Sequence, residues 1–211
     1  MKIDSTIRTC AIVGNSPSII GKNYGKEIDS HDVVIRCNAG TTIGYERDVG
    51  HRTDYRLINI HIFHWVMNQG VREIESHLRN LDVQNVFSDG EVLILKDFSL
   101  KPEQEIDGEF KEHHAWGTIK QLHDIETKTF FMPKIALRKL NIWPHVSTGT
   151  YAAALARYLF PEAKIECYGF SFYEGATEES HYFENLEGKK LCHDFKRDFT
   201  EFQKIPNVWV K

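Results

Sequence analysis

The 211-residue sequence lacks the features that define several large classes of protein. No apolar run approaches the roughly 18 residues that a membrane-spanning helix needs. Charged residues precede a short apolar patch at the N-terminus, unlike the long apolar core of a secretory signal peptide. The formal net charge of -4 disfavours a nucleic-acid-binding protein. We therefore expect a soluble, cytoplasmic protein with no membrane span and no nucleic-acid partner.

Cysteine is also scarce, and no two cysteines form a C-x-x-C pair. This spacing indicates neither a disulfide scaffold nor a zinc knuckle. Reduced thiols in a cytoplasm are the simplest interpretation of the four residues, which are Cys10, Cys37, Cys167 and Cys192. No H-E-x-x-H sequence occurs, and we predict no metal site.

Common nucleotide-binding motifs are missing as well. Neither G-x-G-x-x-G nor the P-loop pattern occurs, so neither a dinucleotide fold nor a P-loop is indicated. An Asp-x-Asp triplet is absent too. Many nucleotide-sugar enzymes hold Mg²⁺ or Mn²⁺ between carboxylates to neutralise a leaving diphosphate. Among nucleotide sugars, this absence weakly favours a donor that leaves as a monophosphate, which is a CMP-sugar.

What is present predicts one α/β domain over residues 1–211. Hydrophobic residues make up 41% of the chain, enough for a packed core. Short apolar runs predict strands at Thr9–Gly14, Asp32–Cys37, Val92–Leu95 and Lys164–Tyr168. An alanine-rich segment predicts a helix over Thr150–Phe160. Strands alternating with helices indicate a sheet with helices on both faces. We predict further helices and mobile loops between about residues 63 and 143.

Two junctions at the starts of helices are candidate phosphate sites. Asn15 and Ser16 follow the first strand, where Ser16 is a predicted N-cap with Pro17 at the first helical position. Ser147–Gly149 opens the long helix. Helix N-termini present free N–H groups to an anion, and ligands of open α/β sheets lie beyond the carboxyl ends of the strands. The alternative is that both junctions are ordinary helix caps.

Two histidines are candidate catalytic residues because they lie beyond the last predicted strand. His181 and His193 occupy a polar, aromatic segment that is placed to fold over the crevice. A neutral imidazole, with a pKa near about 6.5, suits proton transfer from a hydroxyl at neutral pH. Taken singly, each histidine is more simply explained as a structural residue.

Four segments resemble the motifs of the animal-type sialyltransferases, in the order of that family. The large sialylmotif is matched over about residues 9 to 58, by Cys10–Ser16, Tyr24–Arg36, Asn38, Gly44–Gly50 and Arg52–Thr53. Ser147–Gly149 through Tyr168–Phe170 resembles the small sialylmotif. His181–Glu184 resembles the third motif, and His193 with Asp198 resembles the very small motif, in which the family has glutamate.

This resemblance implies a GT-A-like fold and an inverting, metal-independent sialyltransferase without a cofactor. The enzyme would move sialic acid from CMP-sialic acid to a hydroxyl of a terminal sugar on a glycan. His181 would donate to the departing phosphate, and His193 would be the general base. Residues implied or indicated for donor binding are Asn15, Ser16, Asn38, Ser147, Thr148, Gly149, Gly169 and Phe170.

One departure from the family concerns a disulfide. Secretory members join the cysteine of the large motif to one in the small motif, where this chain has Phe160. We therefore expect a cytoplasmic, bacterial or viral version of the enzyme. Two alternatives stay open. One is a transferase that uses CMP-Kdo or CMP-Kdn in capsule or lipopolysaccharide synthesis, and the other is a non-catalytic CMP-binding module. The partners expected are a CMP-sugar and a glycan acceptor.

Overall fold

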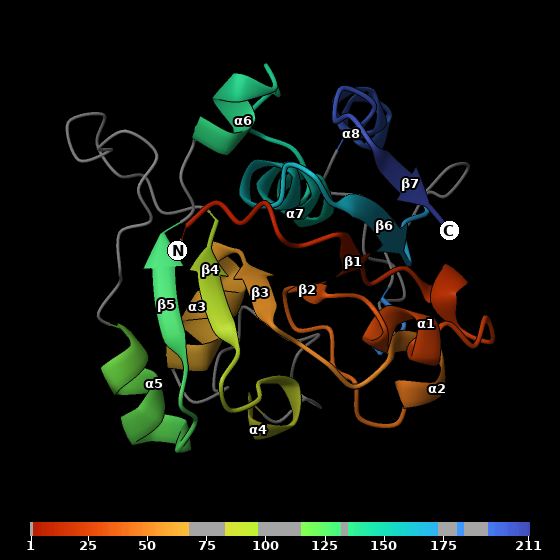
Figure 1. The fold of residues 1–211 in the computed structure, drawn as a ribbon. Helices are drawn as coiled ribbons and strands as arrows, with labels where there is room; N and C mark the ends of the chain where they lie inside the picture. The colour runs from red at the N-terminus through yellow and green to blue at the C-terminus, as the bar shows by residue number, and fades with distance from the viewer. Residues whose placement is uncertain (1, 68–82, 97–114, 132–134, 173–180, 184–193) are drawn as a thin grey trace.

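A computed structural model describes residues 2–67, 83–96, 115–131, 135–172, 181–183 and 194–211. Within these residues, seven strands form one sheet in the order β5-β4-β3-β2-β1-β6-β7, and every neighbouring pair is parallel (Figure 1). The strands are β1 (Thr9–Val13), β2 (Val33–Cys37), β3 (Tyr55–Ile58), β4 (Val92–Leu95), β5 (Lys128–Phe131), β6 (Lys164–Tyr168) and β7 (Val208–Val210).

Helices cover both faces of this sheet. The described helices are η1 (Pro17–Ile19, a 3₁₀ turn), α1 (Gly25–Asp29), α2 (Glu46–Val49), α3 (Ile60–Met67), α4 (Val83–Val86), α5 (Ala115–His123), α6 (Ile135–Lys139), α7 (Thr148–Leu159) and α8 (Phe195–Phe202). Figure 1 shows α6, α7 and α8 on one side of the sheet and α1, α2 and α4 on the other. The predicted α/β fold with helices on both faces is confirmed.

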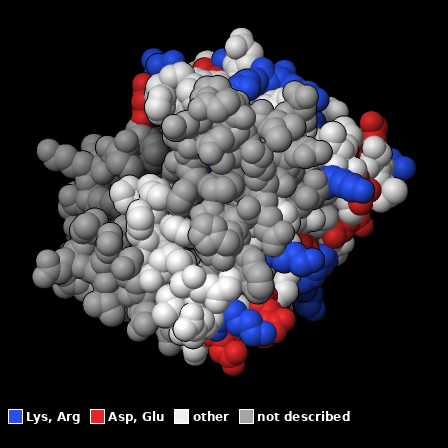
Figure 2. Space-filling model, turned by 90° about the vertical axis from the view of Figure 1, so that its left-hand side faces the viewer, with Lys and Arg blue, Asp and Glu red and all other residues white. Residues whose placement is uncertain are grey.

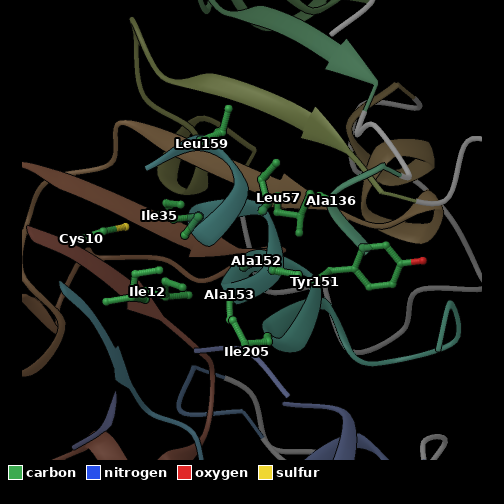
Figure 3. Close-up of a cluster of buried hydrophobic side chains, with 14 of the residues drawn as sticks. Cys10, Ile12, Ile35, Leu57, Ala136, Tyr151, Ala152, Ala153, Leu159 and Ile205 are labelled. Atoms are coloured by element: carbon green, nitrogen blue, oxygen red, sulfur yellow. The ribbon is translucent and has the colours of Figure 1, made fainter. Parts of the chain in front are cut away.

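Helix α7 fills the centre of one face. Its alanines pack among alternate side chains of β1, β2 and β3, so the helix backbone lies close to the sheet. Figure 3 shows Ile12, Ile35 and Leu57 gathered near Ala152 and Ala153. Because these contacts extend across three strands, the core fixes where the helix begins.

Four predicted strands and the long helix are found close to their expected bounds, whereas three strands were not predicted. β3 was missed because Arg56 is the second of its four residues and leaves only Leu57 and Ile58 as an apolar pair, although the Arg56 side chain is only 1% exposed. In β2 the equally buried Arg36 follows three apolar residues, so the strand pattern remains.

β5 and β7 lie at the two edges of the sheet. β5 begins with the polar residues Lys128 and Thr129, and β7 has only three residues, so neither gives a clear apolar pattern. Apart from the strand at Val92–Leu95, we expected only helices and loops between about residues 63 and 143. The strand β5 shows that this expectation was wrong at Lys128–Phe131.

None of the described helices is both long enough and apolar enough to cross a membrane. On the face drawn in Figure 2, described lysine and arginine side chains lie beside aspartate and glutamate side chains at several places around the rim.

A group of charges joins β6 to the end of the chain. The Glu166 carboxylate lies 2.8 Å from Lys211 Nζ, 3.0 Å from Lys164 Nζ and 3.3 Å from His31 Nε2. Burial opposes ionisation of Glu166, but these hydrogen bonds outweigh it and lower the pKa of the carboxyl group to about 2. The ionised carboxylate therefore stabilises the folded state.

The substitution Glu166→Gln tests this contribution. A carboxyl group whose pKa falls on folding stabilises the protein above its unfolded pKa of about 4.5, and this stabilisation is lost as pH falls toward about 2. We expect wild type to exceed the variant in unfolding free energy above pH 5, with a difference that shrinks on acidification. Urea titrations at a series of pH values measure it. The exposed residue Glu162 provides the control Glu162→Gln, and a pH-independent difference for Glu166→Gln would contradict the assignment.

Candidate functional site

The candidate site lies at the carboxyl edge of the sheet. All strands run in the same direction, so the loops after β1, β2 and β6 leave from the same edge. These loops carry Asn15, Asn38 and Gly169, and the first turn of α7 meets them there. Ligands of open parallel sheets bind in this position. The structure therefore brings together the donor-binding residues named from the sequence, and their roles stay predictions.

Two asparagine side chains connect the loops. Asn15 Nδ2 donates to the Cys37 carbonyl oxygen at 3.1 Å, while Asn15 Oδ1 is buried and has no hydrogen-bond partner among the described residues. Asn38 has a left-handed backbone, with φ of 50°, and its Nδ2 donates to Thr148 Oγ1 at 3.4 Å. Asparagine tolerates this conformation better than most residues. The Asn15 side chain therefore leaves one acceptor unused at this edge of the sheet.

Ser16 acts locally as the predicted cap. Its Oγ accepts from Ser18 N at 3.2 Å at the start of η1, with Pro17 next in the chain. The Ser16 backbone N–H also donates to the Gly169 carbonyl oxygen at 3.1 Å. This bond ties the loop after β1 to the loop after β6.

Glycines let the ring of Phe170 enter between two loops. A Cβ atom on Gly149 would lie 2.7 Å from Phe170 Cε1, and one on Gly14 would lie 2.6 Å from the Gly169 carbonyl oxygen. Gly169 itself has a φ of 69°, which glycine adopts without strain. Phe170 thus packs directly against the first turn of α7. Its expected place at a cytidine pocket stays a prediction.

The start of α7 is held by a buried carboxylate. Ser147 is the N-cap, and its Oγ accepts from Thr150 N at 3.3 Å. Asp198 of α8 accepts hydrogen bonds from Ser147 N and Ser147 Oγ, both at 2.7 Å, and from Thr150 Oγ1 at 3.1 Å. The Ser147 hydroxyl thus donates a hydrogen bond to Asp198 and accepts one from Thr150 N, and these two bonds fix the orientation of the first turn of α7. The backbone N–H groups of Thr148 and Gly149 have no acceptor within the helix.

The segment 181–183 crosses the loops after β1 and β2. The Tyr182 backbone N–H donates to the Asn15 carbonyl oxygen at 3.0 Å, and its hydroxyl donates to the Thr41 carbonyl oxygen. Burial raises the pKa of Tyr182 to about 12, so the hydroxyl keeps its proton at neutral pH. The adjacent His181 stacks on Phe183, with ring centroids 5.4 Å apart. Tyr182 therefore anchors His181 beside the site.

Some predicted residues fall outside the described part of the chain. His193, Glu184 and Cys192 belong to residues 184–193, for which the structure gives no placement. The described residue Asp194 caps α8 by accepting from Arg197 N at 3.0 Å. The role of His193 stays a prediction from the resemblance.

Buried Arg56 supports the loop that carries Asn38. Its guanidinium donates to the carbonyl oxygens of Asn38 and Gly40, at 3.0 and 2.9 Å, and pairs with Glu91 at 3.0 Å. Burial raises the pKa of Glu91, while the charge of Arg56 opposes that rise. Arg56 thus stabilises a loop whose backbone is unusual. Its position inside a strand gave no functional signal in the sequence.

Lys96 was not identified from the sequence. It directly follows β4, and its Nζ donates to the Val146 carbonyl oxygen at 2.9 Å, next to the N-cap of α7. A lysine immediately after a buried strand, at the carboxyl edge, is the signal that could have indicated it. Among the described residues, no group of three metal-ligating side chains is placed to hold an ion, and metal independence stays a prediction.

The fold and the site together define an α/β protein in which a helix begins at the carboxyl edge of the sheet, a position that suits an anionic ligand. The model of the family described as glycosyltransferase family 29 (sialyltransferase) matches residues 2–207. The chain therefore belongs to this family, which confirms the resemblance seen in the motifs. The match also covers the middle of the chain, where no motif was recognised.

Curated relatives match over shorter segments. The chain is 50% identical over 56 residues to the β-galactoside α-2,6-sialyltransferase 2 of Danio rerio, covering 26% of this chain and 11% of that protein. It is 41% identical over 81 residues to the CMP-N-acetylneuraminate-β-galactosamide-α-2,3-sialyltransferase 1 of Mus musculus, covering 38% and 24%. The matched segments thus span a quarter or less of these relatives.

Solved structures match over almost the whole chain. A mammalian sialyltransferase superposes with a TM-score of 0.59 at 20% identity, covering 97% of this chain and 69% of that one. The crystal structure of a mammalian sialyltransferase in complex with Gal-beta-1-3GalNAc-ortho-nitrophenol gives a TM-score of 0.56 with the same coverage. At this identity the likeness shows the fold, and the predicted GT-A-like fold is confirmed.

The contacts of Asp198 predict a loss of stability in Asp198→Asn. Asparagine keeps one acceptor oxygen and replaces the other with an amino group that cannot accept a hydrogen bond. At least one buried hydroxyl or N–H at the start of α7 then loses its partner, at a cost of about 1–3 kcal/mol. Urea unfolding followed by circular dichroism measures this loss.

The matched control is Asp194→Asn on the same helix. Asparagine and aspartate are equally good N-caps, so we expect this variant to unfold like wild type. Equal unfolding midpoints for the Asp198 and Asp194 variants would mean that the buried carboxylate does not hold the start of α7.

Proposed function

We propose that this chain transfers sialic acid from CMP-sialic acid to a hydroxyl of a terminal sugar on a glycan, with inversion and without a metal ion. The observation that carries the proposal is the family match over residues 2–207. The described residues that correspond to family motifs converge on one edge of the sheet, which supports it.

Donor binding follows from the hydrogen-bonding groups at this edge. The Thr148 and Gly149 N–H groups, at the positive end of α7, face the place where the donor phosphate and sugar carboxylate would lie. The buried Asn15 oxygen, which has no hydrogen-bond partner among the described residues, would accept from a hydroxyl or amino group of the nucleoside. Asn38 lies between them and contacts Thr148. Gly169 and Phe170 would line the cytidine pocket.

The reaction needs charge stabilisation at the leaving group and a base at the acceptor. C2 of the sugar acid carries both a carboxylate and the CMP leaving group, so its bond to CMP breaks with oxocarbenium character. The first turn of α7 and His181 would stabilise the negative charge that develops on the phosphate. His193 would take the proton of the acceptor hydroxyl as its oxygen attacks C2 from the opposite face. This direction of attack inverts the configuration at C2.

The names of two relatives indicate which acceptor to supply. The names of the relatives from Danio rerio and Mus musculus specify galactoside and galactosamide acceptors. We therefore propose a galactose-terminated glycan as the first acceptor to examine. CMP-Kdo and CMP-Kdn remain alternative donors, and capsule or lipopolysaccharide would then be the acceptor.

A donor panel tests the proposed reaction. We expect CMP release and product formation from CMP-Neu5Ac, in the presence of EDTA, when galactose- or GalNAc-terminated acceptors are supplied. Turnover with CMP-Kdo or CMP-Kdn alone would keep the transferase and change its donor. CMP binding without turnover on any acceptor would favour the non-catalytic module. Mass spectrometry of the acceptor measures transfer separately from donor hydrolysis.

The His193→Ala variant completes this experiment. Loss of a general base typically lowers the rate by about 10²–10⁴-fold, while CMP binding should remain. His51→Ala is the control, because His51 is an exposed histidine at the end of α2. Transfer at the wild-type rate by His193→Ala would remove His193 from the mechanism.

We also propose that the protein works with reduced thiols, as in a cytoplasm. Cys10, Cys37 and Cys167 are buried and free, and Phe160, at the family's second cysteine position, packs in the same core as Cys10. The expectation of a bacterial or viral source stays a prediction.

Thiol titration tests the reduced state. Burial raises the pKa of Cys37 to about 12 and also raises those of Cys10 and Cys167, so these thiols should react slowly in the native protein. We expect four thiols after denaturation without reductant. A count of two would indicate a disulfide and contradict the proposal.

A further inference from the structure

One buried side chain holds the loop that follows β2. Arg56 lies in β3, is only 1% exposed, and uses all five of its N–H groups. Nη1 donates to the carbonyl oxygens of Asn38 and Gly40, at 3.0 and 2.9 Å. Nε and Nη2 donate to the Glu91 carboxylate, at 3.0 and 3.4 Å, and Nη2 also donates to the Val86 carbonyl oxygen at 2.8 Å. These bonds give the guanidinium one fixed orientation beneath the loop.

The two loop carbonyls place both asparagines of the candidate site. Asn38 has a left-handed backbone, and its side chain reaches Thr148 at the start of α7. A Cβ atom on Gly40 would lie 2.6 Å from Asn15 Oδ1, so the Gly40 backbone lies directly against this oxygen. Arg56 thus acts on Asn38 through the carbonyl of that residue, and on Asn15 through Gly40.

Glu91 keeps the guanidinium in place. Its buried carboxylate lies just before β4 and pairs with Arg56. Because Arg36 of β2 is paired with Arg56 in the register of the sheet, the charge of Glu91 also offsets the repulsion between these two arginines. A buried ion pair adds little to stability, because the cost of removing both charges from water offsets their attraction. What the planar guanidinium supplies is direction, since its N–H groups have fixed angles.

We propose that Arg56 and Glu91 form a positioning pair for donor binding, which sets Asn38 and Asn15 in the arrangement that a CMP-sugar meets. This inference rests on the proposed function and adds to it two buried residues that do not touch the substrate. A loop that is already ordered loses little freedom when a ligand binds, and this smaller loss strengthens binding. Without the guanidinium, the left-handed backbone of Asn38 would compete with more common conformations, and CMP would have to order it.

Calorimetric titration of the purified chain with CMP tests this proposal in two variants. Arg56→Lys keeps a positive charge beside Glu91, but it replaces five N–H donors by three and loses the planar fork. Arg56→Met combined with Glu91→Met removes both charges, so no unpaired charge is buried. We expect each variant to weaken CMP binding by about 10-fold, the effect of ordering one further backbone residue on binding. Circular dichroism establishes that each variant is folded at the temperature of the titration.

The matched control is Arg157→Lys. The Arg157 guanidinium also donates to backbone carbonyls, but those of Pro161, Ala163 and Asn207 precede β6 and β7, at the opposite edge of the sheet. We expect this variant to unfold at a lower urea concentration and to bind CMP like wild type, because Asp198 still holds the start of α7. It separates the loss of a buried guanidinium from the loss of orientation at the loop.

Hydrogen exchange of the wild-type chain provides a measurement that needs no variant. The Asn38 N–H donates to the Leu57 carbonyl oxygen at 2.9 Å, and the Gly40 N–H donates to the Cys37 carbonyl oxygen at 3.2 Å. An ordered loop predicts that both amides are protected before CMP is added and gain little protection from it. Exchange rates from NMR at these two positions, with and without CMP, measure this.

Three results would overturn this inference and leave the proposed function in place. They are wild-type CMP affinity in either Arg56 variant, an equal loss of affinity in Arg157→Lys, and amides of Asn38 and Gly40 that become protected only with CMP. A wild-type chain that bound no CMP would overturn the proposed function together with the inference.

Discussion

The hydrogen bonds between the Asp198 carboxylate and the first turn of α7 are the interaction on which the site depends. They join two segments 51 residues apart in sequence and fix a helix terminus whose N–H groups point out of the core. At the other end of α7, Arg157 donates to carbonyl oxygens of the chain that follows, including Pro161 and Ala163. Between these ends, small alanine side chains hold the helix against the sheet. Because α7 is fixed at both ends and along its length, the position of its first turn at the site is fixed by the core.

A parallel sheet supplies the second constraint, because it brings every strand's outgoing loop to one edge. The loops after β1 and β2 adopt irregular backbones there, which need support from buried groups. Arg56 provides this support by hydrogen bonding to the Asn38 and Gly40 carbonyls, and Glu91 offsets its charge. Tyr182 adds a contact from a distant part of the chain. Buried polar groups, Arg56 and Tyr182, therefore position the polar groups of the site. Packing of apolar side chains alone could not satisfy these loop carbonyls.

Sequence alone predicted the parts of the fold in which local pattern and burial agree. β1, β2, β4 and β6 are short, largely apolar segments with turn residues before or after them, and α7 is rich in strong helix formers. β3 was missed because its buried arginine leaves only two consecutive apolar residues in the strand, and the contacts that satisfy this arginine join distant segments, which a local pattern does not contain. Within the site, the motif residues could be named, but the contacts of Asp198, Tyr182 and Lys96 join distant segments and required the folded chain.

The small charge of a helix terminus makes its position decisive. A helix terminus contributes the equivalent of about half a positive charge, and its influence falls off within the first turn. The hydrogen bonds of Asp198 to Ser147 and Thr150 hold this turn of α7 in place. Donors fixed in this way would act on the leaving group of the proposed reaction, where negative charge increases as the bond to the sugar breaks.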